Sequence, residues 1–167
     1  MRLLLMRHAQ AENGVTAQDV QRILTEQGKL EAAEAAIFLR DYQIDKIIVS
    51  YAKRTIQTSN IIQEKVTPGE IEIVTELYQL SQENAIKLLA AQEDRNKHIL
   101  VIGHNPIIYN IALDLSNSNS KKYDHLIATA MHTAQIVIID FPSINSWEEI
   151  LKSKGNIIEI FVPVLKH

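Results

Sequence analysis

The sequence predicts a three-layer α/β/α fold with a mostly parallel central sheet and an antiparallel edge. Short runs of Ile, Val and Leu alternate along the chain with stretches whose apolar residues recur at helical spacing. Such an alternation of strands and helices is typical of a parallel sheet with helices on both faces. The apolar runs contain no alternating polar positions, as expected for strands that are covered on both sides.

Strands and helices are expected to alternate over the first two thirds of the chain. Thr25 and Ser81 can each accept a hydrogen bond from the first free N–H groups of a helix. Pro106 suits the first position of a later helix, with Asn105 as its cap. The predicted strands are 2–7, 47–50, 71–74 and 98–102, and the predicted helices are 25–42, 56–66, 81–91 and 106–115.

The C-terminal third is predicted to add the antiparallel edge. Residues 135–141 and 157–162 are further apolar runs, and the segment between them is too short for a helical crossover between parallel strands. The polar segments 10–18 and 116–122 are predicted to be loops, the second of them mobile. The second is also too short to link two domains, so residues 1–167 are expected to form a single domain.

Composition excludes several classes of function. The 17 Lys and Arg residues are balanced by 20 Asp and Glu, and no basic run is interleaved with aromatics, which argues against nucleic-acid binding. The chain has no Cys, which excludes disulfides, cysteine nucleophiles and thiolate metal sites. No run reaches the roughly 20 apolar residues of a membrane helix, and the N-terminal run is too short for a signal peptide. A cytoplasmic protein without a membrane partner is expected.

Basic and imidazole side chains follow three of the predicted strands. Arg7 and His8 end the first strand, Arg54 comes just after the second, and His104 follows the fourth. The carboxyl ends of parallel strands share one edge of the sheet, where ligands bind. Each residue alone would be an ordinary loop or surface residue. Together they predict an anion pocket, because Arg matches phosphate oxygens well.

These residues and their surroundings resemble a known family. Arg7-His8, the segment from Ser50 to Thr58 and the run Gly103-His104-Asn105-Pro106 are together similar to the histidine phosphatase superfamily, which has the phosphoglycerate-mutase-like fold. The start of the motif, residues 7–12, resembles SixA-like phosphohistidine phosphatases. It lacks the Arg-His-Gly-x-Thr start that is common in mutases and sugar phosphatases.

The resemblance implies a reaction and a set of roles. His8 would attack phosphorus and form a phosphohistidine intermediate that water hydrolyses. Arg7, Arg54 and His104 would hold the non-bridging oxygens without a metal or another cofactor. The implied substrate is phosphohistidine on a partner protein, such as a phosphorelay domain. A phosphomonoesterase for small metabolites and a non-catalytic phosphate- or phosphoprotein-binding module remain alternatives.

One departure from the mutase pattern bears on the substrate. Gln79 stands near the place where the mutase branch usually has a proton-donating Glu, and an amide cannot supply a proton. An alkoxide leaving group needs that proton, whereas phosphohistidine releases a neutral imidazole once its ring is protonated. Glu76 and Glu83 lie nearby in the sequence and could replace the missing acid, so the proton donor stays open.

Other residues are weaker candidates for the site. Gln10, Asn105, Glu83 and His132 are expected substrate contacts. His132 precedes the fifth strand, where a surface histidine is the commoner outcome. A metal site would need His8, His104 and a loop carboxylate such as Glu12, and no metal is expected.

Overall fold

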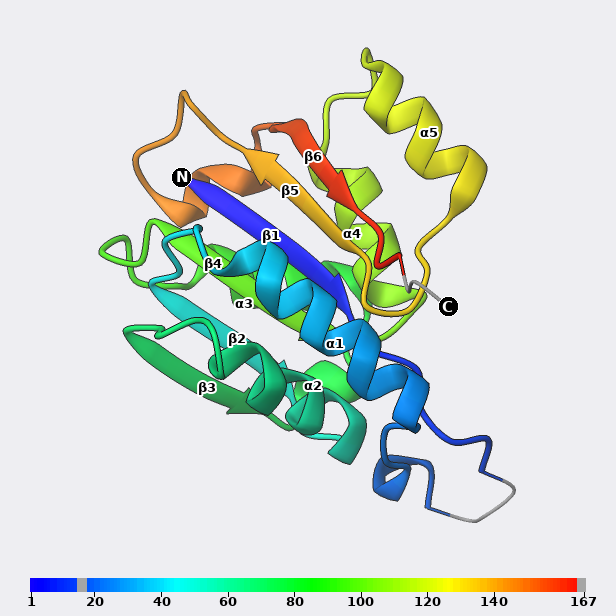
Figure 1. The fold of residues 1–167 in the computed structure, drawn as a ribbon. Helices are drawn as coiled ribbons and strands as arrows, with labels where there is room; N and C mark the ends of the chain where they lie inside the picture. The colour runs from blue at the N-terminus through cyan, green and yellow to red at the C-terminus, as the bar shows by residue number, and fades with distance from the viewer. Residues whose placement is uncertain (15–17, 165–167) are drawn as a thin grey trace.

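The protein forms one six-stranded mixed sheet with the strand order β3-β2-β4-β1-β5-β6 (Figure 1). The computed structural model describes residues 1–14 and 18–164, so part of the predicted loop 10–18 and the side chain of Glu76 lie outside the described residues. The strands are β1 (Arg2–Arg7), β2 (Lys46–Ser50), β3 (Glu70–Val74), β4 (His98–Gly103), β5 (Ile136–Asp140) and β6 (Asn156–Phe161).

Strand directions confirm the predicted mixture of a parallel sheet and an antiparallel edge. β1 to β4 are mutually parallel, because β4 pairs in parallel with both β1 and β2, and β2 pairs in parallel with β3. β5 runs antiparallel to β1, and β6 antiparallel to β5. The change of direction therefore falls at β5, beside the most central part of the sheet.

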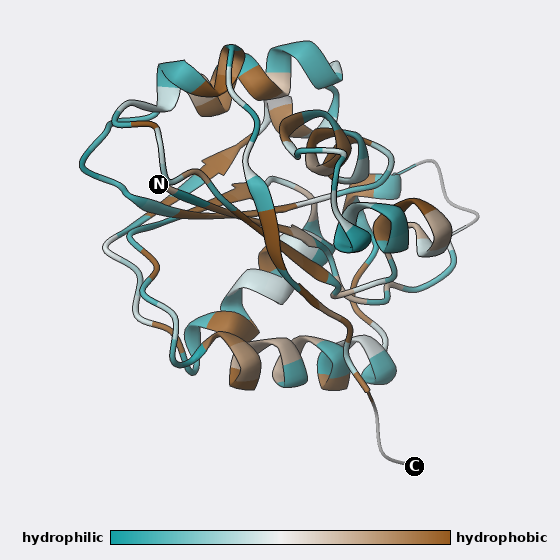
Figure 2. Cartoon of the chain, turned by 90° about the horizontal axis from the view of Figure 1, so that it is seen from above, coloured by the Kyte–Doolittle hydropathy of each residue, from teal (hydrophilic) through white to brown (hydrophobic). Residues whose placement is uncertain are grey.

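Helices cover both faces of the sheet, as Figure 2 shows from above. Alternate residues of β1 point to opposite sides: Leu3 and Leu5 join one buried apolar cluster, and Leu4 and Met6 join the other. The helices are α1 (Glu26–Leu39), α2 (Lys53–Gln63), α3 (Gln82–Ala90), α4 (Ile107–Leu115) and α5 (Lys121–Thr129), with 3-10 turns η1 (Asp19–Gln21), η2 (Glu76–Tyr78) and η3 (Trp147–Leu151). Among the described residues, no helix has the length and apolarity to cross a membrane.

Two of the predicted helix caps are confirmed. The Thr25 hydroxyl accepts a hydrogen bond from the Gly28 N–H at 2.9 Å, and the Ser81 hydroxyl accepts one from the Asn84 N–H at 3.3 Å. Gly28 also lets α1 approach the turn after β1, because an added Cβ would lie 1.9 Å from the Gln10 carbonyl oxygen. Close packing of α1 therefore holds the segment that carries His8.

The predicted start of α4 is wrong. Asn105 does not cap this helix, because Pro106 stands at the N-cap position and α4 begins at Ile107. The Asn105–Pro106 peptide bond is cis. The Asn105 side chain instead donates to the Met131 carbonyl at 3.1 Å. The Asn105 side chain, which the sequence pattern assigned to the helix cap, is thus used in a hydrogen bond to the segment before β5.

The predicted loop 116–122 is also partly wrong, because α5 begins at Lys121. Ser120 caps this helix, accepting a hydrogen bond from the Tyr123 N–H at 3.1 Å. Leu126 is the only residue of α5 that is buried. Tyr123, Leu126 and Ile127 recur at helical spacing, but the polar run that precedes them dominated the sequence pattern of this segment.

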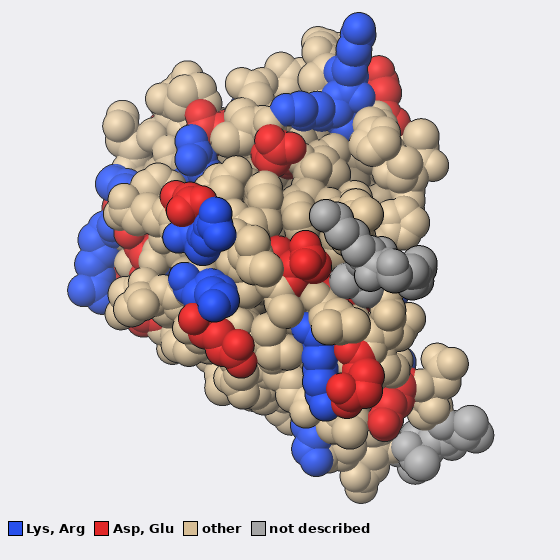
Figure 3. Space-filling model, viewed as in Figure 1, with Lys and Arg blue, Asp and Glu red and all other residues tan. Residues whose placement is uncertain are grey.

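Charges of both signs are dispersed over the face that carries α1. Figure 3 shows Lys and Arg interspersed with Asp and Glu on this face, without one continuous basic area. A nucleic acid binds through a basic patch that neutralises its phosphates. The visible face does not offer such a patch.

Candidate active site

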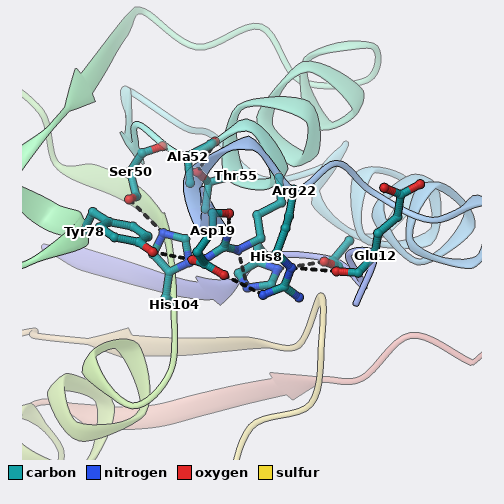
Figure 4. Close-up of polar contacts among 11 residues, drawn as sticks. His8, Glu12, Asp19, Arg22, Ser50, Ala52, Thr55, Tyr78 and His104 are labelled. Atoms are coloured by element: carbon teal, nitrogen blue, oxygen red, sulfur yellow. Dashed lines mark hydrogen bonds and ion pairs between the residues drawn. The ribbon is translucent and has the colours of Figure 1, made fainter. Parts of the chain in front are cut away.

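Three of the predicted residues meet at the carboxyl edge of neighbouring strands. His8 follows β1, His104 follows β4, and Arg54 lies in the first turn of α2, directly after β2. Arg54 Nε donates to His8 Nε2 at 3.2 Å, and the rings of His8 and His104 have centroids 5.1 Å apart (Figure 4). The strand order β2-β4-β1 brings together residues that are far apart in the chain.

His8 is oriented as a neutral imidazole whose unprotonated nitrogen is Nε2. Its Nδ1 lies 2.7 Å from the Ala9 carbonyl oxygen, which can only accept, so Nδ1 carries the proton. Burial lowers the pKa of His8 to about 4. The Ala9 carbonyl opposes this shift, and the charges of Arg54 and Arg7 add to it. At neutral pH the Nε2 lone pair is therefore available, and in this structure it accepts from Arg54.

His104 is the second buried imidazole of the site. Its Nε2 is hydrogen-bonded to the Ser50 hydroxyl at 2.8 Å, and its ring makes a T-shaped contact with the Tyr78 ring, with 5.2 Å between the centroids. Burial, followed by the proximity of His8 and Arg54, lowers the pKa of His104 to about 3. An anion bound beside His104 would oppose this shift, so a phosphoryl group and a proton on His104 favour each other.

Arg7 points toward the segment before β5. Its Nη1 donates to the Met131 carbonyl at 2.9 Å, the same oxygen that accepts from Asn105. Burial lowers the pKa of Arg7, Glu31 opposes this shift, and an Arg remains charged in proteins. Arg7 Nε and His104 Nδ1 are buried and have no partner among the described residues. Buried polar atoms are nearly always hydrogen-bonded, so these two need a polar partner that the described side chains do not supply.

Asp19, Arg22 and Tyr78 also belong to this cluster, although the sequence pattern singled out none of them. Arg54 donates to the Asp19 carbonyl and to its carboxylate, each at 2.8 Å. The same carboxylate accepts from Arg22 Nη1 at 2.7 Å and from the Tyr78 hydroxyl. The Tyr78 hydrogen bond, followed by that of Arg22, lowers the pKa of Asp19 well below its usual range. In return, Asp19 raises the pKa of Tyr78.

Three of the weaker candidates make their contacts elsewhere. Gln10 accepts from the Thr25 hydroxyl at 2.7 Å, beside the start of α1. Glu83 pairs with Lys87 at 2.6 Å on the exposed side of α3, and Lys87 lowers the pKa of this carboxyl. His132 is exposed, and its backbone makes its hydrogen bonds: the N–H donates to the Gln135 side chain and the carbonyl accepts from the Gln135 N–H. Asn105 alone of the four shares a partner with a main site residue, Arg7.

The described side chains form no cluster of metal ligands. Among residues 1–14 and 18–164, no three His, Asp or Glu side chains lie together in a way that could hold a metal ion. Glu12, the third member of the conceivable metal site, is exposed, and its backbone carbonyl accepts from Arg22 Nε at 2.6 Å. The cluster is built instead from cations and imidazoles, which suit an oxyanion.

Comparison with solved structures shows what this fold is similar to. Two similar structures are proteins assigned as phosphohistidine phosphatase SixA, from Nakamurella multipartitia (TM-score 0.83, 24% identity, 98% of this chain and 96% of that chain) and from Agrobacterium tumefaciens (TM-score 0.79, 24% identity, 97% of each chain). A third is the protein histidine phosphatase SixA complexed with tungstate (TM-score 0.78, 22% identity, 98% and 97%). At these identities the likeness concerns the fold.

The sequence itself matches a family profile over its N-terminal half. No curated protein matches the chain by sequence. Residues 3–82, which contain Arg7, His8 and Arg54, match the profile of the histidine phosphatase superfamily, branch 1. The full-length fold agrees with this match, including β4 and the His104 that follows it. The N-terminal part of the chain, with Arg7, His8 and Arg54, is therefore similar to branch 1 of the histidine phosphatase superfamily.

Proposed function

We propose that the protein is a metal-independent phosphohistidine phosphatase that works through a covalent phospho-His8 intermediate. The observation that carries the proposal is the state of His8. The Ala9 carbonyl holds Nδ1 at 2.7 Å, and the lone pair of Nε2 faces Arg54. A neutral, oriented imidazole surrounded by cations is equipped to attack a phosphoryl group.

In the first step, Nε2 of His8 attacks phosphorus in line and forms a P–N bond, while the bond from phosphorus to the substrate imidazole breaks. Arg54 Nε, which donates to His8 Nε2 in the free protein, turns to a non-bridging oxygen. Arg7 Nε is an unpartnered donor, and the unpartnered His104 Nδ1 becomes a donor when it carries a proton, so both can hold further oxygens. Positive charge placed around the phosphoryl oxygens stabilises the transition state.

In the second step, water attacks the phospho-His8 phosphorus and the P–N bond to His8 breaks. Inorganic phosphate leaves, and the imidazole of His8 returns to its neutral form with the proton on Nδ1. The Ala9 carbonyl accepts from Nδ1 throughout, so the tautomer that starts the cycle is also the one that ends it.

The choice of phosphohistidine rests on how the leaving group departs. Asp19 is the carboxylate that contacts Arg54, and its pKa is held well below the usual range, so it has no proton to give. Glu83 is engaged with Lys87 on α3, and Gln79 is an amide. A substrate whose leaving group is a protonated imidazole needs little acid catalysis, whereas an alkoxide needs it strongly.

The comparisons supply secondary support. Three structures of similar fold are called SixA, and one of them holds tungstate, a tetrahedral oxyanion. On this basis the partner is a protein that carries phosphohistidine, such as a phosphorelay domain in the cytoplasm. The rival enzyme is a phosphomonoesterase for a small metabolite, and the rival from another class is a phosphate- or phosphoprotein-binding module without turnover.

The test compares substrates under identical conditions. Release of phosphate is measured from a histidine-phosphorylated protein, from a panel of metabolite phosphates and from a chromogenic phosphate ester. We expect the fastest turnover with phosphohistidine and its loss in His8→Ala. His125→Ala, which removes an exposed imidazole from α5, is the matched control and keeps full activity.

Each rival predicts a different result. Faster hydrolysis of a metabolite phosphate, still dependent on His8, would favour the phosphomonoesterase. Binding of the phosphorylated protein without release of phosphate from any substrate would favour the binding module. A radiolabelled phosphodonor should leave alkali-stable, acid-labile label on the wild-type chain. Label that persists in His8→Ala would reject His8 as the nucleophile.

A further inference from the structure

We propose that Asp19 is a positioning residue that holds Arg54 with its Nε–H directed at the phosphoryl group on His8. The inference rests on the proposed function only in that a phosphoryl group is bound at His8. Asp19 belongs to η1, between β1 and α1, and reaches Arg54 on α2 and Tyr78 on η2. Figure 4 shows Asp19 between Tyr78, Arg22 and His8.

The hydrogen bonds of Arg54 divide its guanidinium into two sides. Nη1 donates to the Asp19 carbonyl and Nη2 to the Asp19 carboxylate, each at 2.8 Å. Nε donates to His8 Nε2 at 3.2 Å. An Arg has five N–H donors, so one hydrogen on each terminal nitrogen is left over. Asp19 therefore binds the two terminal nitrogens of the guanidinium. The Nε–H is left to change its acceptor from His8 to a phosphoryl oxygen.

Burial makes this anchoring necessary. The Arg54 side chain is only 6% exposed, whereas that of Asp19 is 44% exposed. A buried cation without a partner is strongly unfavourable, and an unanchored guanidinium would also sample other rotamers. The Asp19 carboxylate balances the charge of Arg54, and the two hydrogen bonds to Asp19 fix the direction of the guanidinium.

Asp19 is itself held by groups that keep it anionic and in place. Arg22 donates to its second oxygen at 2.7 Å, and the Tyr78 hydroxyl donates to the oxygen that Arg54 uses. Arg22 is tied to the Glu12 carbonyl at 2.6 Å. The turn η1 buries none of its residues, so these polar contacts set its position. One carboxylate between two guanidinium groups leaves a net positive charge for the substrate.

The opposite role is that Asp19 competes with the substrate as an internal anion. Under that reading, the phosphoryl group would have to displace the carboxylate from Arg54, and removal of Asp19 would tighten anion binding. The positioning role predicts weaker binding instead. The sign of the change separates the two readings.

The experiment measures binding of inorganic phosphate by calorimetry and hydrolysis of a chromogenic phosphate ester. We expect Asp19→Ala to weaken phosphate binding by about 10- to 100-fold, the range for loss of a hydrogen bond to a charged group. kcat for the ester should fall as well, because Arg54 also stabilises the transition state. Asp19→Asn keeps one acceptor oxygen for Arg54 and should recover part of both losses. Asp41→Ala removes an exposed partner of Arg40 and is the matched control.

A double-mutant cycle tests whether Asp19 acts through Arg54. In an Arg54→Ala background, Asp19→Ala should change the phosphate affinity by less than about 2-fold, because coupled residues are not additive. An equal loss in both backgrounds would overturn the inference, as would tighter or unchanged binding in Asp19→Ala. Thermal melting of all variants shows that they are folded.

Failure of the proposed function gives a different pattern. If the wild type hydrolyses the ester but not phosphohistidine, the substrate assignment fails, and the order of phosphate affinities still decides the role of Asp19. If neither the wild type nor Asp19→Ala binds phosphate, both the proposed site and the role of Asp19 are wrong.

Discussion

Protonation of His8 offers a quantitative test of the site, because its buried imidazole should make folding stability depend on pH. The pKa of His8 is lowered from 6.5 to about 4. Below pH 6.5 the unfolded chain takes up a proton at this position while the folded protein does not, so acid favours unfolding. The stability is fully present above pH 6.5 and falls as the pH drops toward 4.

The size of the effect follows from the shift. One pKa unit corresponds to about 1.4 kcal/mol, so the full shift of His8 corresponds to roughly 3 kcal/mol, most of which is lost between pH 7.5 and 4.5. His8→Gln removes this titration but keeps a polar side chain of similar size. The variant should therefore lose roughly 2–3 kcal/mol less than the wild type over the same pH range.

The assay is urea denaturation of both proteins at half-unit pH steps, with the pH dependence of the free energy of unfolding as the readout. A two-dimensional NMR titration of the imidazole signals reports the pKa of His8 directly. His125→Gln on the exposed side of α5 controls for loss of an imidazole as such. Parallel curves for the wild type and His8→Gln, together with an NMR midpoint near 6.5, would refute the reasoning that burial and cations keep His8 neutral.

Three further predictions follow from packing and hydrogen bonds. Gly28→Ala should destabilise the protein by about 1–3 kcal/mol in urea denaturation, and lower activity, because its Cβ would meet the Gln10 carbonyl. Ser50→Ala should reduce kcat/KM by about 3- to 10-fold, because His104 Nε2 loses its partner; unchanged kinetics would mean that Ser50 does not position the ring. Glu83→Gln should leave the rate of phosphate release unchanged, whereas a large loss would restore Glu83 as the proton donor.

Much of the fold could be predicted because its signals are local. The strands can be recognised as apolar runs in the sequence. The helix caps Thr25 and Ser81 can be recognised because each hydroxyl accepts from an N–H only three residues further along the chain. α5 was not predicted because it follows directly on a polar run, which favours a loop, although Tyr123, Leu126 and Ile127 recur at helical spacing. The start of α4 was mispredicted, since the Asn105 amide is used by Met131, a residue that no local pattern connects to it.

The sequence by itself determined the fold class and the meeting of His8, Arg54 and His104, because residues that follow parallel strands must share one edge of the sheet. Only the tertiary structure decided how these side chains are held. Asp19 contacts Arg54 and Tyr78 across separations of 35 and 59 residues, from a segment without apolar periodicity. A hydrogen bond between distant polar side chains cannot be recognised from the local sequence pattern. Its geometry exists only once the sheet and the turns around it have folded.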